Sequence, residues 1–188
     1  MGQDITTTLV EEHRLIKRML SLLERNAPLT AAGRYGNYRF YLDGVEFIRN
    51  YADRFHHAKE EDMLFAALVA NGMPRENSPV AAMLLEHDQG RAYVRAMEEA
   101  TVQASAGTAG QDRVIADNAL AYAELLREHI TKEDDILYPL AERLIPETRR
   151  EAILDGYREA DGKNPAAFTA HYEAIVARYE AESVPQAA

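Results

Sequence analysis

Apolar residues recur every three or four positions in four long stretches of this 188-residue chain, and this spacing constrains its fold most. In the first stretch, from Asp4 to Asn26, they are Leu9, Val10, Ile16, Leu20 and Leu23. Such spacing places apolar side chains on one face of an α-helix. No stretch of any length alternates apolar and polar residues as a β-strand does. The chain is therefore predicted to be all-α.

Turn-forming residues separate the four stretches. The segment after Asn26 contains Pro28 and Gly33, and the two later breaks read NGMPRENSP and SAGTAGQ. Pro139 is expected to kink the fourth helix. Three further long helices are thus predicted, over residues 38–70, 80–104 and 112–144, and Ile136 is expected on the core face of the last one. Four long helices joined by short loops favour an up-down-up-down four-helix bundle.

Two shorter helical segments are expected after Pro146. Asn164 and Pro165 have the residue types of an N-cap and a first helical position, so the last helix is predicted to begin there. The predicted organisation is a bundle over residues 1–145 and a helical appendage over residues 146–188, packed on or beside it.

The composition excludes several classes of protein. A formal net charge of -10 argues against a DNA- or RNA-binding surface. The absence of cysteine excludes disulfides, thiolate zinc sites and iron–sulfur clusters. No apolar run is long enough to span a bilayer, and the N-terminus lacks the pattern of a secretory signal. We expect a cytoplasmic protein without nucleic-acid or membrane partners.

One histidine falls on the apolar face of each long helix: His13, His57, His87 and His129. Two of them have a glutamate four residues later, Glu61 after His57 and Glu133 after His129. Residues four apart lie on the same face of an α-helix, so each pair can direct an imidazole and a carboxylate to one point.

The segment FHHAKEEDMLF contains two adjacent histidines and two adjacent glutamates. At about 100° per residue, His57 and Glu61 are expected to face inward. His56 and Glu60 then form an exposed ion pair on the surface. The N-terminal part of the inward face carries Glu46, Asn50 and Asp53, which predicts a wetter end or an access route.

Four histidines and two glutamates are costly to bury in an apolar core, and metal ions offset that cost. Imidazole nitrogens and carboxylate oxygens suit Fe, Mn or Zn, and a bridging glutamate suits two ions. Six side chains shared by two ions leave open positions, which is typical of a reactive centre.

The chain resembles the hemerythrin-like family, also called HHE cation-binding domains. The resemblance runs from about Leu9 to Leu144 and is carried by EEHRLIK, FHHAKEEDMLF, LLEHDQGR and LREHITKEDDILYPLAE. It implies a four-helix bundle around two iron ions with an oxo or hydroxo bridge. It also implies that Glu61 and Glu133 bridge the ions and that the four histidines are terminal ligands.

Two departures distinguish the chain from oxygen-carrying members of that family. Arg91 stands where their third helix has a second histidine, and the spacing from His129 to Glu133 is shorter. The resemblance is closer to members linked to nitric oxide or peroxide chemistry, iron–sulfur repair, or sensing. Arg91 is expected either to pair with Glu61 or a bound anion, or to extend to solvent. Tyr122 is either an outer hydrogen-bond donor or a core aromatic.

Four functions stay open from the sequence. The first is a di-iron protein that binds O2, NO or peroxide at an open iron site. The second is an enzyme that reduces NO or peroxide with electrons from a redox partner protein. The third is an iron or oxygen sensor, an iron store, or an iron donor for cluster repair. The fourth is a bundle that holds zinc or no metal.

Overall fold

The computed structural model describes residues 4–183, in which every regular element is helical, and it confirms the predicted all-α class. The elements are α1 (Thr7–Ala31), α2 (Tyr38–Phe47), η1 (Ile48–His57), η2 (Glu60–Phe65), α3 (Ala66–Ala70), α4 (Pro79–Ser105), α5 (Gln111–Lys132), η3 (Glu133–Leu137), α6 (Tyr138–Leu144), α7 (Glu147–Gly162) and α8 (Phe168–Glu180).

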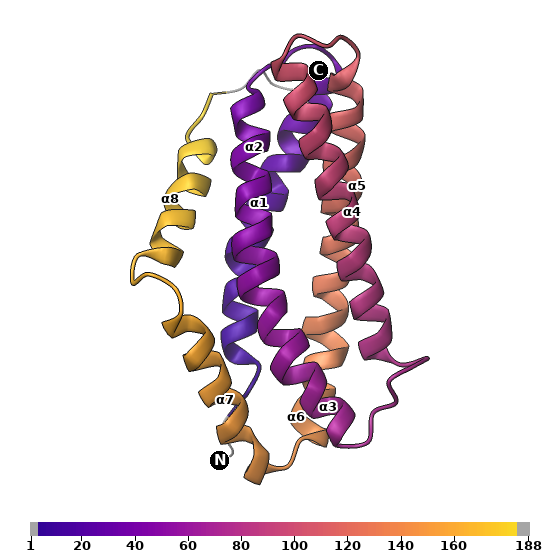
Figure 1. Ribbon diagram of the computed structural model, residues 1–188, viewed down its shortest axis with the longest axis vertical. Helices are drawn as coiled ribbons and strands as arrows, with labels where there is room; N and C mark the ends of the chain where they lie inside the picture. Colours follow the sequence, from indigo (N-terminus) through magenta and orange to yellow (C-terminus); the bar gives the residue numbers. More distant parts are fainter. Residues whose placement is uncertain (1–3, 184–188) are drawn as a thin grey trace.

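Four long rods form the body of the molecule (Figure 1). The rods are α1, the run from α2 to α3, α4, and the run from α5 to α6, and they alternate in direction. Helix α5 packs on both α4 and α1, and α2 packs on α4. This arrangement confirms the predicted helical bundle.

The labels η1, η2 and η3 mark π-helical turns, in which each N–H bonds five residues back rather than four. In η3 the N–H of Tyr138 reaches the carbonyl of Glu133. Such a turn contains one extra residue. The side chains after it therefore face inward one position later in the sequence than they would on an α-helix. Ile136, expected in the core, is 58% exposed, and Leu137 is buried in its place. Pro139 lies in the first turn of α6, directly after this wide turn.

Two helix ends differ from the predicted ones. Helix α1 continues through Pro28 to Ala31, because this buries Leu29 and lets Thr30 bond the hydroxyl of Tyr41 at 2.7 Å.

The last helix begins at Phe168, not at Pro165. The Asn164 side chain instead bonds back to the carbonyl of Ala160, and the N–H of Phe168 bonds to the carbonyl of Pro165 in a turn. The N-cap predicted at Asn164 is therefore wrong.

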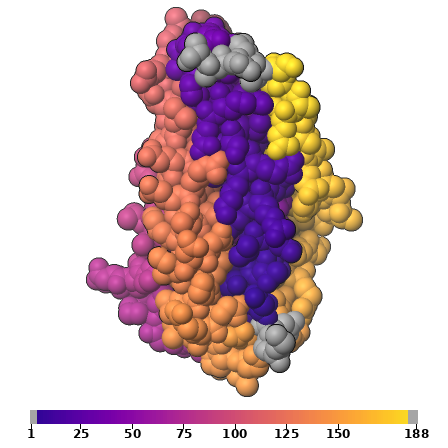
Figure 2. Space-filling model, turned by 180° about the vertical axis from the view of Figure 1, so that it is seen from behind, coloured from indigo at the N-terminus to yellow at the C-terminus, as the bar shows by residue number. Residues whose placement is uncertain are grey.

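The two C-terminal helices lie along one side of the bundle (Figures 1 and 2). Helix α8 packs on α1 and α2, while α7 packs on η2. Tyr172 and Val176 of α8 belong to the same apolar cluster as Phe47. The division of the chain near residue 145 stays a prediction.

Two apolar clusters fill the core, one toward each end of the bundle. One cluster includes Leu20, Phe47 and Val94, and the other includes Leu9 and Leu64. The four histidines singled out in the sequence lie along the rods between these clusters. No helix within residues 4–183 is long and apolar enough to cross a membrane.

We expect Tyr172→Ala to lower the free energy of unfolding by about 3 kcal/mol, because it removes a buried ring from the junction of α8 with the bundle. The Tyr172 ring contacts Phe47, Tyr51 and Phe168. Denaturant unfolding measures the change. The exposed neighbour His171 provides the control, since His171→Ala should change stability by less than about 0.5 kcal/mol. Equal effects of the two variants would contradict this packing.

Candidate metal centre

Seven buried polar side chains meet in the middle of the bundle, and we call them the His–Glu cluster. They form two groups that share Glu60, and within each group the donor atoms lie within 4.8 Å of one another. One group is His57, Glu60, His87 and His129; the other is His13, His56, Glu60 and Glu133. All four rods contribute, so five of the six predicted ligand residues are brought together.

His57 faces inward as predicted, but the predicted orientation of the other three residues of the adjacent pairs in FHHAKEEDMLF is wrong. His56 and Glu60 are 1% and 0% exposed, and both belong to the His–Glu cluster. Glu61 lies outside it, where its carboxylate bonds His87 Nδ1 at 2.7 Å and Arg91 at 2.7 Å. The physical reason is the π-helical geometry of η1 and η2, to which an angle of 100° per residue does not apply.

An outer carboxylate orients nearly every histidine of the cluster. Four Nδ1 atoms lie within hydrogen-bond distance of a carboxylate: His13 to Asp134 at 2.8 Å, His56 to Glu12 at 2.9 Å, His87 to Glu61 at 2.7 Å and His129 to Glu86 at 2.9 Å. In the fifth, His57 Nδ1 is 3.5 Å from Asp53. When Nδ1–H donates outward, the lone pair of Nε2 faces inward, as in metal-bound histidines.

Cations hold these outer carboxylates from the other side. Lys17 bonds Asp134 at 2.8 Å, and Lys132 bonds Glu86. The fully buried Lys59 bonds Glu12 and, at 2.9 Å, Asp161 of α7.

Arg91 forms an ion pair with Glu61 in the way that the lysines do with the other outer carboxylates. The bond from His87, together with Arg91, lowers the pKa of Glu61 to about 2. This carboxylate is therefore ionised at neutral pH and can accept the histidine proton.

The two inner carboxylates have few partners. Both oxygens of Glu133 and Oε2 of Glu60 are buried and make no hydrogen bond to the described residues. Glu133 Oε1 lies 3.0 Å from His129 Nε2, and Oε2 lies 3.4 Å from His13 Nε2, without hydrogen-bond alignment. Burial and the charge of Glu133 raise the pKa of Glu60 well above its ordinary value. A buried carboxylate in this state needs a proton or a cation.

The imidazole nitrogens converge as closely as the carboxylates. Nε2 of His87 and Nε2 of His129 are 3.0 Å apart, and the rings of His57 and His87 stack at 3.8 Å. Inward lone pairs repel one another unless a proton or a cation lies between them. Neutral nitrogens beside unpartnered carboxylate oxygens are the donor set of Fe, Mn and Zn, so the residues fit a metal centre.

The donors are divided unequally. Three histidines belong to one group and two to the other, while the two Glu133 oxygens lie toward different groups.

The set of residues predicted from the sequence omitted His56. It also omitted Tyr138, whose hydroxyl donates to Glu60 Oε1 at 2.5 Å and lies 3.4 Å from His13 Nε2. The doubled letters HH and EE were the only signal for His56 and Glu60.

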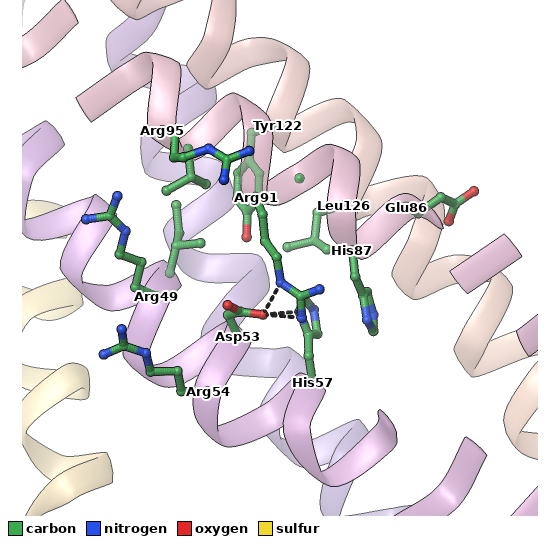
Figure 3. Close-up of a pocket in the computed structure, with 13 residues that line it drawn as sticks. Arg49, Asp53, Arg54, His57, Glu86, His87, Arg91, Arg95, Tyr122 and Leu126 are labelled. Carbon is green, nitrogen blue, oxygen red and sulfur yellow. Dashed lines mark hydrogen bonds and ion pairs between the residues drawn. The ribbon is translucent and has the colours of Figure 1, made fainter. Parts of the chain in front are cut away.

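A cavity of about 360 Å³ reaches the cluster from the side and is lined in part by Asp53, His57 and His87 (Figure 3). It lies where the sequence predicted a wetter end of the second helix. Arg91 crosses the cavity and pairs with Asp53 and Glu61. Pairing with Glu61 is one of the two roles that the sequence predicted for Arg91. Tyr122 is a buried aromatic whose hydroxyl has no hydrogen-bond partner in residues 4–183.

A comparison with protein-family models matches residues 4–141 to the hemerythrin HHE cation-binding domain, which confirms the resemblance seen in the sequence. Comparisons with curated proteins and with solved structures found no significant match.

Glu60→Gln and Glu61→Gln distinguish the ligand set in the structure from the one predicted by spacing. The Glu60→Gln variant loses the carboxylate that both groups share, and we expect it to bind fewer ions per chain than the unaltered protein. In the Glu61→Gln variant the stoichiometry should be unchanged at saturating metal. The affinity should fall about 10–100-fold, because a neutral amide oxygen is a weaker acceptor for His87 Nδ1–H than a carboxylate. Metal analysis after gel filtration measures both. Loss of an ion from the Glu61→Gln variant alone would restore the prediction from spacing.

Metal binding should strengthen as the pH rises. Burial lowers the pKa of His13 and His129, but bonds to Asp134, Glu86 and Glu133 outweigh it, and both pKa values lie above the ordinary 6.5. The metal-free histidines hold protons that an ion must displace, so binding releases protons and is weakened below the raised pKa. Calorimetric titration with Fe(II) between about pH 6 and about pH 8, in buffers of different ionisation enthalpy, measures both effects. A pH-independent affinity without proton release would contradict this.

Proposed function

Because the chain belongs to the family of hemerythrin HHE cation-binding domains, we propose that its His–Glu cluster holds two iron ions and binds a small ligand, O2, NO or peroxide. The observation that carries this proposal is the convergence of five histidine nitrogens on two buried carboxylates with unpartnered oxygens. Bound iron supplies reversible coordination of such ligands. Manganese and zinc fit the same donor atoms, so the identity of the metal is part of the proposal.

The unequal division of the histidines favours one open position. His57, His87 and His129 would hold one ion, and His13 and His56 the other, with Glu60 and Glu133 shared. The ion beside His13 and His56 then has one protein donor fewer. A centre that keeps a position free of protein donors can accept an external ligand.

Tyr138 is placed to stabilise a ligand at that position. Its hydroxyl lies 3.4 Å from His13 Nε2, on the side of the two histidines. Burial and the charge of Glu133 raise the pKa of Tyr138 well above its ordinary value, so the hydroxyl keeps its proton. Its one proton is donated to Glu60 Oε1 in the structure. When that oxygen binds the ions, the hydroxyl is free to donate to an oxygen-containing or partly anionic ligand, and such a buried donor strengthens ligand binding.

Sensing is a second candidate function, favoured by one contact. Asp161 of α7 bonds the buried Lys59, which bonds Glu12 behind His56. A change at the centre is thereby connected to the C-terminal helices through two side chains. Reduction of NO or peroxide is a third candidate and requires electrons from a redox partner protein.

The proposal predicts two irons per chain in the purified protein and absorption typical of a bridged diferric centre. Adding NO or O2 to the reduced protein should change the spectrum reversibly. Metal analysis and a visible spectrum on one sample measure this. One zinc per chain, or a ligand-independent spectrum, would contradict it.

Tyr138→Phe should keep both irons but release NO about tenfold faster, because one hydrogen bond to the ligand is lost. Stopped-flow spectroscopy gives the rate. Tyr157→Phe is the matched control, since this hydroxyl is also buried but has no partner within residues 4–183. The same release rate in both variants would contradict the role given to Tyr138.

A further inference from the structure

One histidine of the His–Glu cluster is held differently from the other four. His57 Nδ1 is buried, yet it makes no hydrogen bond to any residue between 4 and 183. Each of the other four Nδ1 atoms lies 2.7–2.9 Å from a carboxylate oxygen. Asp53, four residues before His57, has its Oδ1 atom 3.5 Å from His57 Nδ1. His57 therefore lacks the short hydrogen bond that orients the other four rings.

Arg91 occupies the acceptor that His57 would use. Its Nε and Nη2 atoms lie 2.9 and 2.7 Å from Asp53 Oδ1, the same oxygen that faces His57. Figure 3 shows Arg91 extending from α4 across the cavity to Asp53, beside His57. A carboxylate oxygen offers about two acceptor positions, and two guanidinium nitrogens lie at this one. Because a cationic donor bonds a carboxylate more strongly than a neutral imidazole does, Arg91 keeps this oxygen.

Two further carboxylates fix Arg91 in this place. Its Nη2 also donates to Glu61 at 2.7 Å, and its Nη1 donates to Asp88 at 3.0 Å. Glu61 is in turn the acceptor of His87 Nδ1. One guanidinium thus supports the acceptor of His87 while it occupies the acceptor of His57. These two rings stack at 3.8 Å, so neighbouring histidines are oriented with unequal strength.

We propose that Arg91 is a positioning residue that competes with His57 for Asp53. While Arg91 is in place, Asp53 does not orient His57, and His57 is the least firmly held of the five histidines. When Arg91 is removed, Asp53 accepts from His57 Nδ1–H and holds the ring as the other outer carboxylates do. This inference rests on the proposed metal centre, in which His57 is a ligand. Since His57 also lines the cavity, the ion that it binds is the one that exchanges first.

The rate of metal release tests this competition. The zinc-loaded protein is mixed with an excess of a coloured chelator, and the absorbance reports how fast the first ion leaves. With Arg91 in place, Asp53→Ala should change that rate less than about twofold, because no orienting hydrogen bond is lost. In the Arg91→Met background, the same substitution should accelerate release at least about tenfold, because His57 then loses its acceptor. Zinc is the probe, so the result does not depend on whether the centre holds iron or binds a small ligand.

Glu86→Ala is the matched control. Glu86 lines the same cavity, and its carboxylate accepts from His129 Nδ1 at 2.9 Å. Its loss should accelerate release at least about tenfold whether or not Arg91 is present. An equally large effect of Asp53→Ala with Arg91 in place, or no effect of Asp53→Ala in the Arg91→Met background, would overturn the proposal.

The imidazole N–H protons give a second readout, which a merely structural role of Arg91 would not move. Zinc is diamagnetic, so NMR of isotope-labelled, zinc-loaded protein can follow the exchange of each Nδ1–H with water. The Nδ1–H of His57 should exchange at least about tenfold faster than that of His129, because a hydrogen bond protects only the latter. In the Arg91→Met variant the exchange at His57 should slow to the rate of His129. Exchange at His57 that is the same with and without Arg91 would overturn the proposal.

Discussion

The structure depends on how seven polar side chains are buried together in the middle of the bundle. An ionised carboxylate in an apolar interior is costly, and the His–Glu cluster contains two carboxyl groups, of which Glu133 makes no hydrogen bond to the described residues. The two ions that we propose among the five histidines offset that cost. The apolar clusters on either side then serve to fix the rods, so that donors from separate helices meet at one point.

The same requirement explains the polar residues around the cluster. Each histidine must present a lone pair inward, so its other nitrogen needs an acceptor. For four of the five histidines the acceptor is a carboxylate that is itself partly buried and is bound by a cation. For Glu12 that cation is the fully buried Lys59. Alternating acidic and basic groups thus extend from the centre to the surface, and through Asp161 they reach α7. Many of the chain's charged residues therefore have a structural role.

The sequence predicted the parts of this structure that depend on regular helices. Four rods, their order and most of their ends follow from apolar spacing and turn residues. Glu133 follows as well, because α5 is a regular helix from Gln111 to Lys132 and the i+4 rule holds up to its end. The positions of π-helical turns could not be predicted, since nothing in the spacing of apolar residues marks them. That is why Glu61 was expected where Glu60 lies, and Ile136 where Leu137 lies.

The wide turns also determine which kinds of genetic change the second rod can tolerate. A π-turn closes around one residue more than an α-turn, so the segment 48–65 holds extra residues without rotating the helix that follows. A substitution on its outer face leaves the wide turns intact. Removing one residue from the wide turns of η1 leaves an ordinary α-turn there, so the later core residue Leu68 keeps its orientation. Only side chains within the turn change direction, so in this segment a deletion threatens the His–Glu cluster more than the apolar core.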